Sequence, residues 1–143
     1  MPMLTNHSSV PEQSTTSFWK YNRPGISWAL LILVLSSITT PSFRIPNLFD
    51  LLAPDKIAHF VFYAVYVVLF YRGFAEMPVN TVYHRNQFSI PLLSGILYGG
   101  LIELYQGYFL PNRTADYVDF IANTIGALIG WGVARWMSGR RVG

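Results

Sequence analysis

Three short stretches of the chain carry most of the residues that could bind a ligand or move a proton. In the first, Asp55 and His59 are four residues apart and therefore share one face of a helix, where the acid could fix the histidine tautomer. In the second, Glu103 follows an apolar run and begins no helix. The full set of candidate ligand-binding residues is Asp55, Lys56, His59, Tyr63, Glu103, Gln106, Arg113, Asp116, Asp119 and Asn123.

The third stretch places Asp116, Asp119 and Asn123 at positions i, i+3 and i+7, again on one helix face. An ionisable group within a membrane span costs about 2–3 kcal/mol or more at its centre, so such groups usually face protein or a water-filled cavity. We therefore expect Glu103 and Asp119 to face a polar interior site. Simpler roles remain open for the others, because an acid often begins a helix and Lys56 could reach out to lipid phosphates.

The charges of this set do not balance. Four acids stand against Lys56, Arg113 and the titratable His59. Because unpaired carboxylates in a low dielectric become neutral, we expect Glu103 to be protonated or bonded to His59 or Arg113. The chain has no cysteine, which excludes disulfides and thiolate metal sites. We expect no cofactor, with a divalent cation held by Asp55, Glu103 and Asp119 as the alternative.

The elements that must position these residues are four apolar segments. The chain is 52% hydrophobic and 12% charged, whereas soluble domains carry about 25% charged residues. The segments at 24–40, 54–73, 88–110 and 116–137 match the ~20 residues that cross a membrane. A soluble bundle is the alternative, but four helices that are apolar all round leave too little protein to bury them. We predict an all-α, four-span membrane protein with a disordered polar tail at 1–23 and a basic tail at 138–143.

The basic residues predict the orientation. Seven Lys and Arg residues flank the segments on one side and three on the other, so both termini should be cytoplasmic and the polar cluster should lie at the outer leaflet. The net charge of +3 is then a sign of topology and not of nucleic-acid binding. We expect a multi-pass protein of the bacterial cytoplasmic (inner) membrane, with the lipid bilayer as its partner.

Glycines suggest how the helices pack. Gly95 and Gly99 on the third segment, and Gly126 and Gly130 on the fourth, are four residues apart, a spacing that lets helices approach closely in lipid. Since a short loop joins these two segments, we predict that they contact each other. The oligomeric state stays open.

The chain resembles the VanZ-like family over about residues 54–136. Three ordered motifs carry the resemblance: Asp55-Lys56-x-x-His59-Phe60-x-x-Tyr63, Gly99-x-x-x-Glu103-x-x-Gln106, and Arg113-x-x-Asp116-x-x-Asp119-x-x-x-Asn123-x-x-Gly126. The resemblance implies a small bacterial multi-pass membrane protein. The founding member of the family is associated with resistance to the glycopeptide antibiotic teicoplanin, without an established biochemical mechanism.

Three functions fit these residues. The first is binding of an envelope lipid, a lipid-linked wall precursor or a lipid-tailed antibiotic, with Lys56 and Arg113 on its phosphate or carboxylate. The second is an enzyme acting on such a lipid, with His59 or Glu103 as general acid or base. The absence of a nucleophile motif favours binding over catalysis. The third is a proton-coupled transporter, which ranks last because such sites usually lie near the bilayer midplane.

Overall fold

The structure is a computed structural model that describes residues 12–38, 54–111 and 115–140, with side chains from residue 18 in the first range and from residue 56 in the second. In these ranges the chain forms helices and turns and no strand, which confirms the all-helical prediction. The helices are α1 (Glu12–Ile38), α2 (Pro54–Ala75), α3 (Val82–Arg85), α4 (Ser89–Phe109) and α5 (Tyr117–Gly139).

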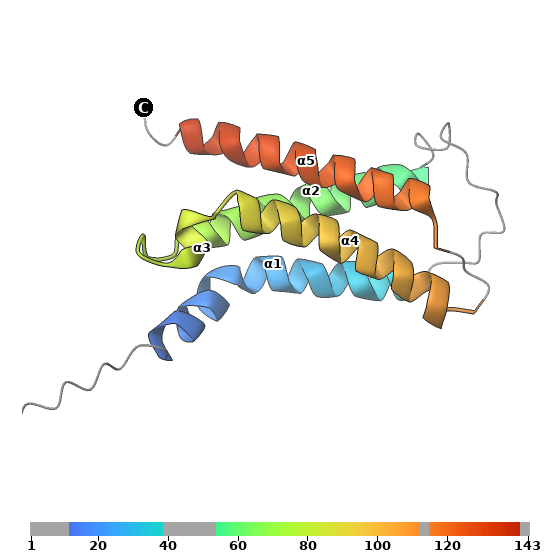
Figure 1. Ribbon diagram of the computed structural model, residues 1–143, viewed down its shortest axis with the longest axis horizontal. Helices are drawn as coiled ribbons and strands as arrows, with labels where there is room; N and C mark the ends of the chain where they lie inside the picture. Colours follow the sequence, from blue (N-terminus) through green and yellow to red (C-terminus); the bar gives the residue numbers. More distant parts are fainter. Residues whose placement is uncertain (1–11, 39–53, 112–114, 141–143) are drawn as a thin grey trace, which may run out of the picture.

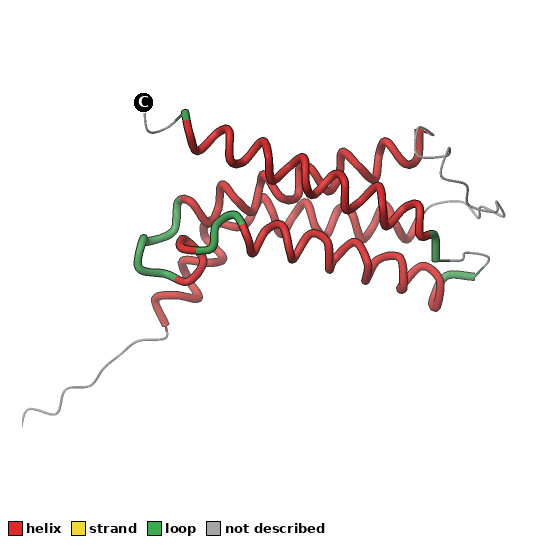
Figure 2. Tube along the Cα trace, turned by 45° about the horizontal axis from the view of Figure 1, so that its top comes forward, coloured by secondary structure: helices red, strands yellow, loops and turns green. Residues whose placement is uncertain are grey.

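Four long helices lie side by side and alternate in direction, as Figures 1 and 2 show. Helix α2 contacts α1, α4 and α5, and its most extensive contact is with α5. The short α3 lies in the turn between α2 and α4, at one end of the bundle. The beginnings of α2 and α5 and the end of α4 meet at the opposite end, where the candidate residues were expected.

The glycines of α5 pack on α2, a partner that the sequence analysis did not name for them. A Cβ atom added at Gly126 would lie 3.0 Å from the Cα atom of Phe60, and one added at Gly130 would lie 2.9 Å from the Cα atom of Ala64. Only hydrogen fits at these two positions, because the backbones of α2 and α5 touch there. A short loop between two helices brings their ends together but does not decide which helix faces the glycines.

The glycines of α4 face both neighbours. A Cβ atom at Gly95 would lie 3.2 Å from the side chain of Val67 on α2. At Gly99 it would lie 3.0 Å from the Cβ atom of Asn123 on α5 and 3.3 Å from the ring of Tyr63 on α2. The expected contact between α4 and α5 is therefore present at Gly99, where the three helices meet.

Helix α1 begins at Glu12, which corrects the prediction of a disordered tail up to residue 23. The reason is a set of contacts at the end of the bundle that holds α3. The ring of Phe18 lies 5.1 Å from that of Tyr83 and 6.1 Å from that of Phe74, and Asn22 is completely buried. Pro24 lies inside the helix, and Figure 1 shows α1 changing direction in its N-terminal part, as proline-containing helices do.

Side chains bonded to backbone carbonyls hold the rest of α1 in place. The indole nitrogen of Trp28 donates to Phe62 O at 2.9 Å, and the hydroxyl of Tyr98 donates to Ala29 O at 2.7 Å. Between these bonds the core is aromatic, with the rings of Tyr66 and Tyr98 stacked 5.6 Å apart. These contacts fix α1 against α2 and α4.

The outer surface of the bundle is apolar. Leu30, Leu93 and Leu97 are each more than half exposed, and many other large apolar side chains also point outward. So many exposed large apolar side chains are typical of a surface that faces lipid or a partner. By length and composition, two described helices could cross a membrane, at Lys56–Ala75 and Tyr117–Gly139. The four spans and the orientation of the termini stay predictions.

Candidate functional site

A buried ion-pair cluster joins the beginnings of α2 and α5. The ammonium of Lys56 lies 2.8 Å from Asp116 Oδ2 and also forms an ion pair with Asp119 Oδ1. Lys56 is only 7% exposed. The expectation that Lys56 reaches lipid phosphates was therefore wrong, because a basic group on α2 is the counter-ion that two acids at the start of α5 require.

Both acids also fit the start of α5. Asp116 is the N-cap residue, and its Oδ1 accepts a hydrogen bond of 2.8 Å from Val118 N. Asp119 lies in the first turn, where a negative charge is stabilised by the positive end of the helix dipole. The simple helix-start role considered for Asp116 is thus real, and the same carboxylate holds Lys56 as well.

Glu103 reaches the same end of the bundle from α4. It is 4% exposed. Its Oε2 accepts a hydrogen bond of 3.3 Å from Asp116 N, and its Oε1 accepts one of 3.5 Å from Asn123 Nδ2. A buried carboxylate that accepts hydrogen bonds from two residues of another helix fixes the position of α4 against the beginning of α5.

Asn123 links Glu103 to His59 by hydrogen bonds. Because its Nδ2 donates to Glu103, its Oδ1 is the atom that lies 3.1 Å from His59 Nδ1. An amide oxygen only accepts, so His59 Nδ1 carries the hydrogen and a neutral ring has its lone pair on Nε2. In the part of the chain that the structure describes, Glu103 and His59 are therefore linked through Asn123 and not directly.

Two other candidate residues, Tyr63 and Gln106, are also buried. Tyr63 is completely buried, and its hydroxyl has no hydrogen-bond partner among the described residues. Gln106 donates from Nε2 to Ser36 O at 2.9 Å and so joins α4 to α1. The side chain of Asp55 and the whole of Arg113 lie outside the described residues.

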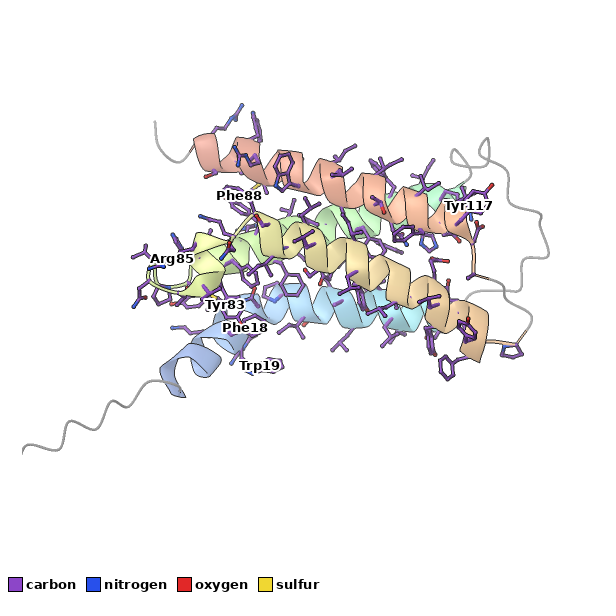
Figure 3. All side chains as sticks on the ribbon, in the orientation of Figure 1. Phe18, Trp19, Tyr83, Arg85, Phe88 and Tyr117 are labelled. Carbon is purple, nitrogen blue, oxygen red and sulfur yellow. The ribbon has the colours of Figure 1, made fainter. Side chains whose placement is uncertain are left out.

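An apolar groove between α4 and α5 opens beside this cluster. Its volume is about 570 Å³, which is in the range of small-molecule sites. Its apolar walls include Leu93, Leu97, Leu101 and Leu104 of α4 and Phe120 of α5. Glu103, Asp116 and Tyr117 form its polar end, and Figure 3 shows Tyr117 at the end of the bundle opposite Tyr83, Arg85 and Phe88.

The sequence analysis missed this groove. The sequence feature that could have indicated the groove is the spacing of apolar residues on α4 at positions 93, 97, 101 and 104, together with Gly100. A Cβ atom at Gly100 would meet only the ring of Phe120, at 3.3 Å. The leucines were interpreted only as part of a membrane span. Whether a neighbouring helix covers this face of α4 depends on how α5 packs on α2.

A metal ion has no group of three ligands in the described residues. The position between Asp116 and Asp119 is taken by the ammonium of Lys56. The cluster as described is thus a network of ion pairs and hydrogen bonds, with carboxylates at the edge of an apolar groove.

Comparison with known proteins supports the resemblance drawn from the motifs. The chain matches the VanZ/LLP1 family over residues 3–138, which includes α1 as well as the three helices that carry the motifs. Comparison with curated proteins and with solved structures finds no match. The match covers nearly the whole chain, and the chain belongs to the VanZ/LLP1 family.

Proposed function

We propose that this protein spans the bacterial cytoplasmic membrane with four helices and binds an amphiphilic envelope molecule in the groove between α4 and α5. The apolar tail would lie along the leucines of α4, and the polar group would reach the carboxylates at the outer-leaflet end. The observation that carries the proposal is this continuous path from apolar walls to Glu103 and Asp116.

The length of the groove supports a lipid-like tail. From Leu93 to Leu104 the helix advances by eleven residues, or about 16 Å at a rise of about 1.5 Å per residue. The hydrocarbon core of a bilayer is about 30 Å thick, so the groove covers about one leaflet. A single tail within one leaflet therefore fits it, with the polar end of the groove at the level of the headgroups.

The rigid polar cluster supports binding at a fixed position. Lys56, Glu103 and Asn123 join α2, α4 and α5 by ion pairs and hydrogen bonds, so the groove wall cannot slide along its neighbours without breaking buried polar contacts. A preformed groove loses little conformational freedom when a tail enters it.

The occupant would be an envelope lipid, a lipid-linked wall precursor or a lipid-tailed antibiotic. These molecules share an apolar tail and a polar head, which is the chemistry the groove provides. Through such binding the protein would alter the susceptibility of the cell to teicoplanin-type antibiotics. Comparing the inhibitory concentration of teicoplanin in cells with and without the gene tests this step separately from binding.

Two glycine substitutions give a matched test of binding. Gly100→Leu fills the groove, because the space beside Gly100 is limited only by the Phe120 ring. Gly132→Leu is the control, since a Cβ atom there has no neighbour within 4 Å. Native mass spectrometry of protein extracted from its own membrane should show a retained amphiphile in the wild type and in Gly132→Leu, and its loss in Gly100→Leu. An equal level of the same adduct in all three proteins, or none in the wild type, would contradict the proposal.

A further inference from the structure

Basic side chains gather at the end of the bundle that holds α3, opposite the polar cluster. By the helix bounds, seven Lys and Arg residues and two acids, Glu12 and Glu76, lie at or beyond this end. The segments 1–11 and 141–143 contain no acidic residue, so they do not neutralise the excess. Six of the bases are described and exposed, and among the described side chains none of the six forms an ion pair: Lys20, Arg23, Arg72, Arg85, Arg135 and Arg140. We call these six residues the basic end.

Aromatic rings hold Arg135 in place. Its guanidinium lies 5.0 Å from the centre of the Phe88 ring, at the start of α4, and 5.5 Å from that of the Trp131 ring on α5. The ring of Phe88 in turn stacks on the buried ring of Tyr71 of α2, with the ring centres 5.2 Å apart. The position of Arg135 is thus tied to three helices, so this side chain loses little conformational freedom when it binds an anion.

The contacts of Arg135 with these rings leave its N–H donors available. Among the described residues, no carbonyl or carboxylate accepts a hydrogen bond from its side chain. A guanidinium can lie over an aromatic ring and still donate from its edge, where its paired N–H groups match two oxygens of a phosphate. Arg135 therefore has the geometry of an ordered phosphate contact.

Exposed aromatic and apolar side chains occur at the same end. Trp19, which Figure 3 shows there, and Trp136 are each more than half exposed, and Arg140 lies over the Trp136 ring at 3.8 Å. Val79 and Val82, around the start of α3, are also more than half exposed. Tryptophan is enriched where a membrane meets water. Bases next to such side chains suit a surface that contacts phosphate groups and the edge of the hydrocarbon together.

We propose that the basic end binds anionic phospholipids through their phosphate groups, with Arg135 as its most ordered contact. Basic clusters beside membrane helices attract anionic lipids, and each Lys or Arg near the surface increases binding about fivefold. A zwitterionic lipid also has a phosphate, but its own ammonium group is repelled by the same bases. This site lies at the other end of the bundle from the polar end of the groove and does not depend on what the groove binds.

Two phospholipids with identical acyl chains test the preference. Phosphatidylglycerol has an anionic head, whereas the phosphate of phosphatidylcholine is joined to a quaternary ammonium. The delipidated protein in mild detergent receives an equal mixture of both, and native mass spectrometry counts each bound lipid. Phosphatidylglycerol should be enriched about fivefold or more among the bound lipids, which is the value of one basic contact. The same enrichment is expected in Gly100→Leu, in which the groove is filled.

Two variants test the residues, and a third is their control. Arg135→Gln should remove most of the enrichment, and Arg140→Gln should reduce it. Both side chains are exposed, so the bundle should fold in either variant, which far-ultraviolet circular dichroism checks. Arg44→Gln removes the same charge from the segment between α1 and α2, which joins these helices at the opposite end, and should leave the enrichment unchanged.

Four results would overturn the proposal. The first is equal binding of the two lipids by the wild type. The second is an enrichment that neither Arg135→Gln nor Arg140→Gln lowers. The third is a loss in Arg44→Gln as large as that in Arg135→Gln, because net charge and not the basic end would then be the cause. The fourth is loss of the enrichment in Gly100→Leu, which would place the anionic lipid in the groove.

Discussion

Replacing Lys56 with methionine should strongly destabilise the bundle, because it leaves Asp116 and Asp119 without their shared counter-ion. The side chain of Lys56 is 8% exposed and that of Asp119 is 5% exposed, so water screens this pair little. Removing one partner of a buried ion pair costs about 3–5 kcal/mol, mainly from the uncompensated charge that remains. We expect Lys56→Met to lower the free energy of unfolding by about this amount.

A compensating variant separates charge from packing. In Lys56→Met/Asp116→Asn/Asp119→Asn the three charges are gone, and the asparagine at position 116 still caps α5. This triple variant should recover most of the stability that Lys56→Met loses, because buried ion pairs are often replaced by neutral groups at little cost. The assay is equilibrium unfolding in mixed micelles of rising SDS content, followed by far-ultraviolet circular dichroism. A triple variant as unstable as Lys56→Met would refute the reasoning, since the loss would then come from the packing of the lysine stem.

Three further predictions concern the packing and the topology. Gly130→Leu should cost about 1–3 kcal/mol or more, because its side chain meets the backbone of Ala64, whereas the open site of Gly132→Leu should be nearly neutral in the same SDS titration. Tyr98→Phe should cost about 1 kcal/mol by removing the hydrogen bond to Ala29 O, and hydrogen exchange should rise in α1 and not in α5. The chain has no cysteine, so Pro111→Cys and Asn80→Cys, both in exposed turns, can be labelled one at a time in intact cells. An impermeant maleimide should modify position 111 and not position 80, and the reverse pattern would contradict the orientation predicted from the basic residues.

Helix spacing was enough to predict which residues of one helix share a face. The structure brings His59 of α2, Glu103 of α4 and Asn123 of α5 to one end of the bundle, where the sequence analysis placed them. The partners within the cluster were not predictable in the same way. Whether Glu103 bonds to His59 or to Asn123 depends on the rotation of three helices about their axes, and periodicity within each helix does not fix that rotation.

One omission and one error have the same physical origin. The short loop predicted a contact between α4 and α5, which is present, but it did not show that Gly126 and Gly130 pack on the backbone of α2 at Phe60 and Ala64. The polar composition of the first 23 residues led to the prediction of a disordered tail. Phe18 and Asn22, which are four residues apart, instead face α2 and α3. In both cases tertiary contacts decided the outcome, and a single sequence shows the surfaces of each helix without showing their partners.

The motif residues alone did not suggest the apolar groove beside them. Polar residues attracted attention because they are rare in an apolar chain, whereas leucines on α4 are expected in any membrane span. These leucines can be recognised as the wall of a groove only in the structure, where α5 packs on α2 and the groove stays open beside Gly100. A candidate ligand site in such an apolar chain is therefore recognised by combining rare polar groups with the apolar surface next to them.

Photo-crosslinking in the native membrane tests the central claim most directly. A photoreactive benzophenone amino acid is placed at Leu97, which lines the groove and is 65% exposed, and in a second protein at Leu30 of α1, which does not line the groove and is 58% exposed. After irradiation, mass spectrometry identifies the molecules attached at each position. A single amphiphile enriched at Leu97 over Leu30 is the predicted result. The same mixture of bulk membrane lipids at both positions would contradict a specific groove.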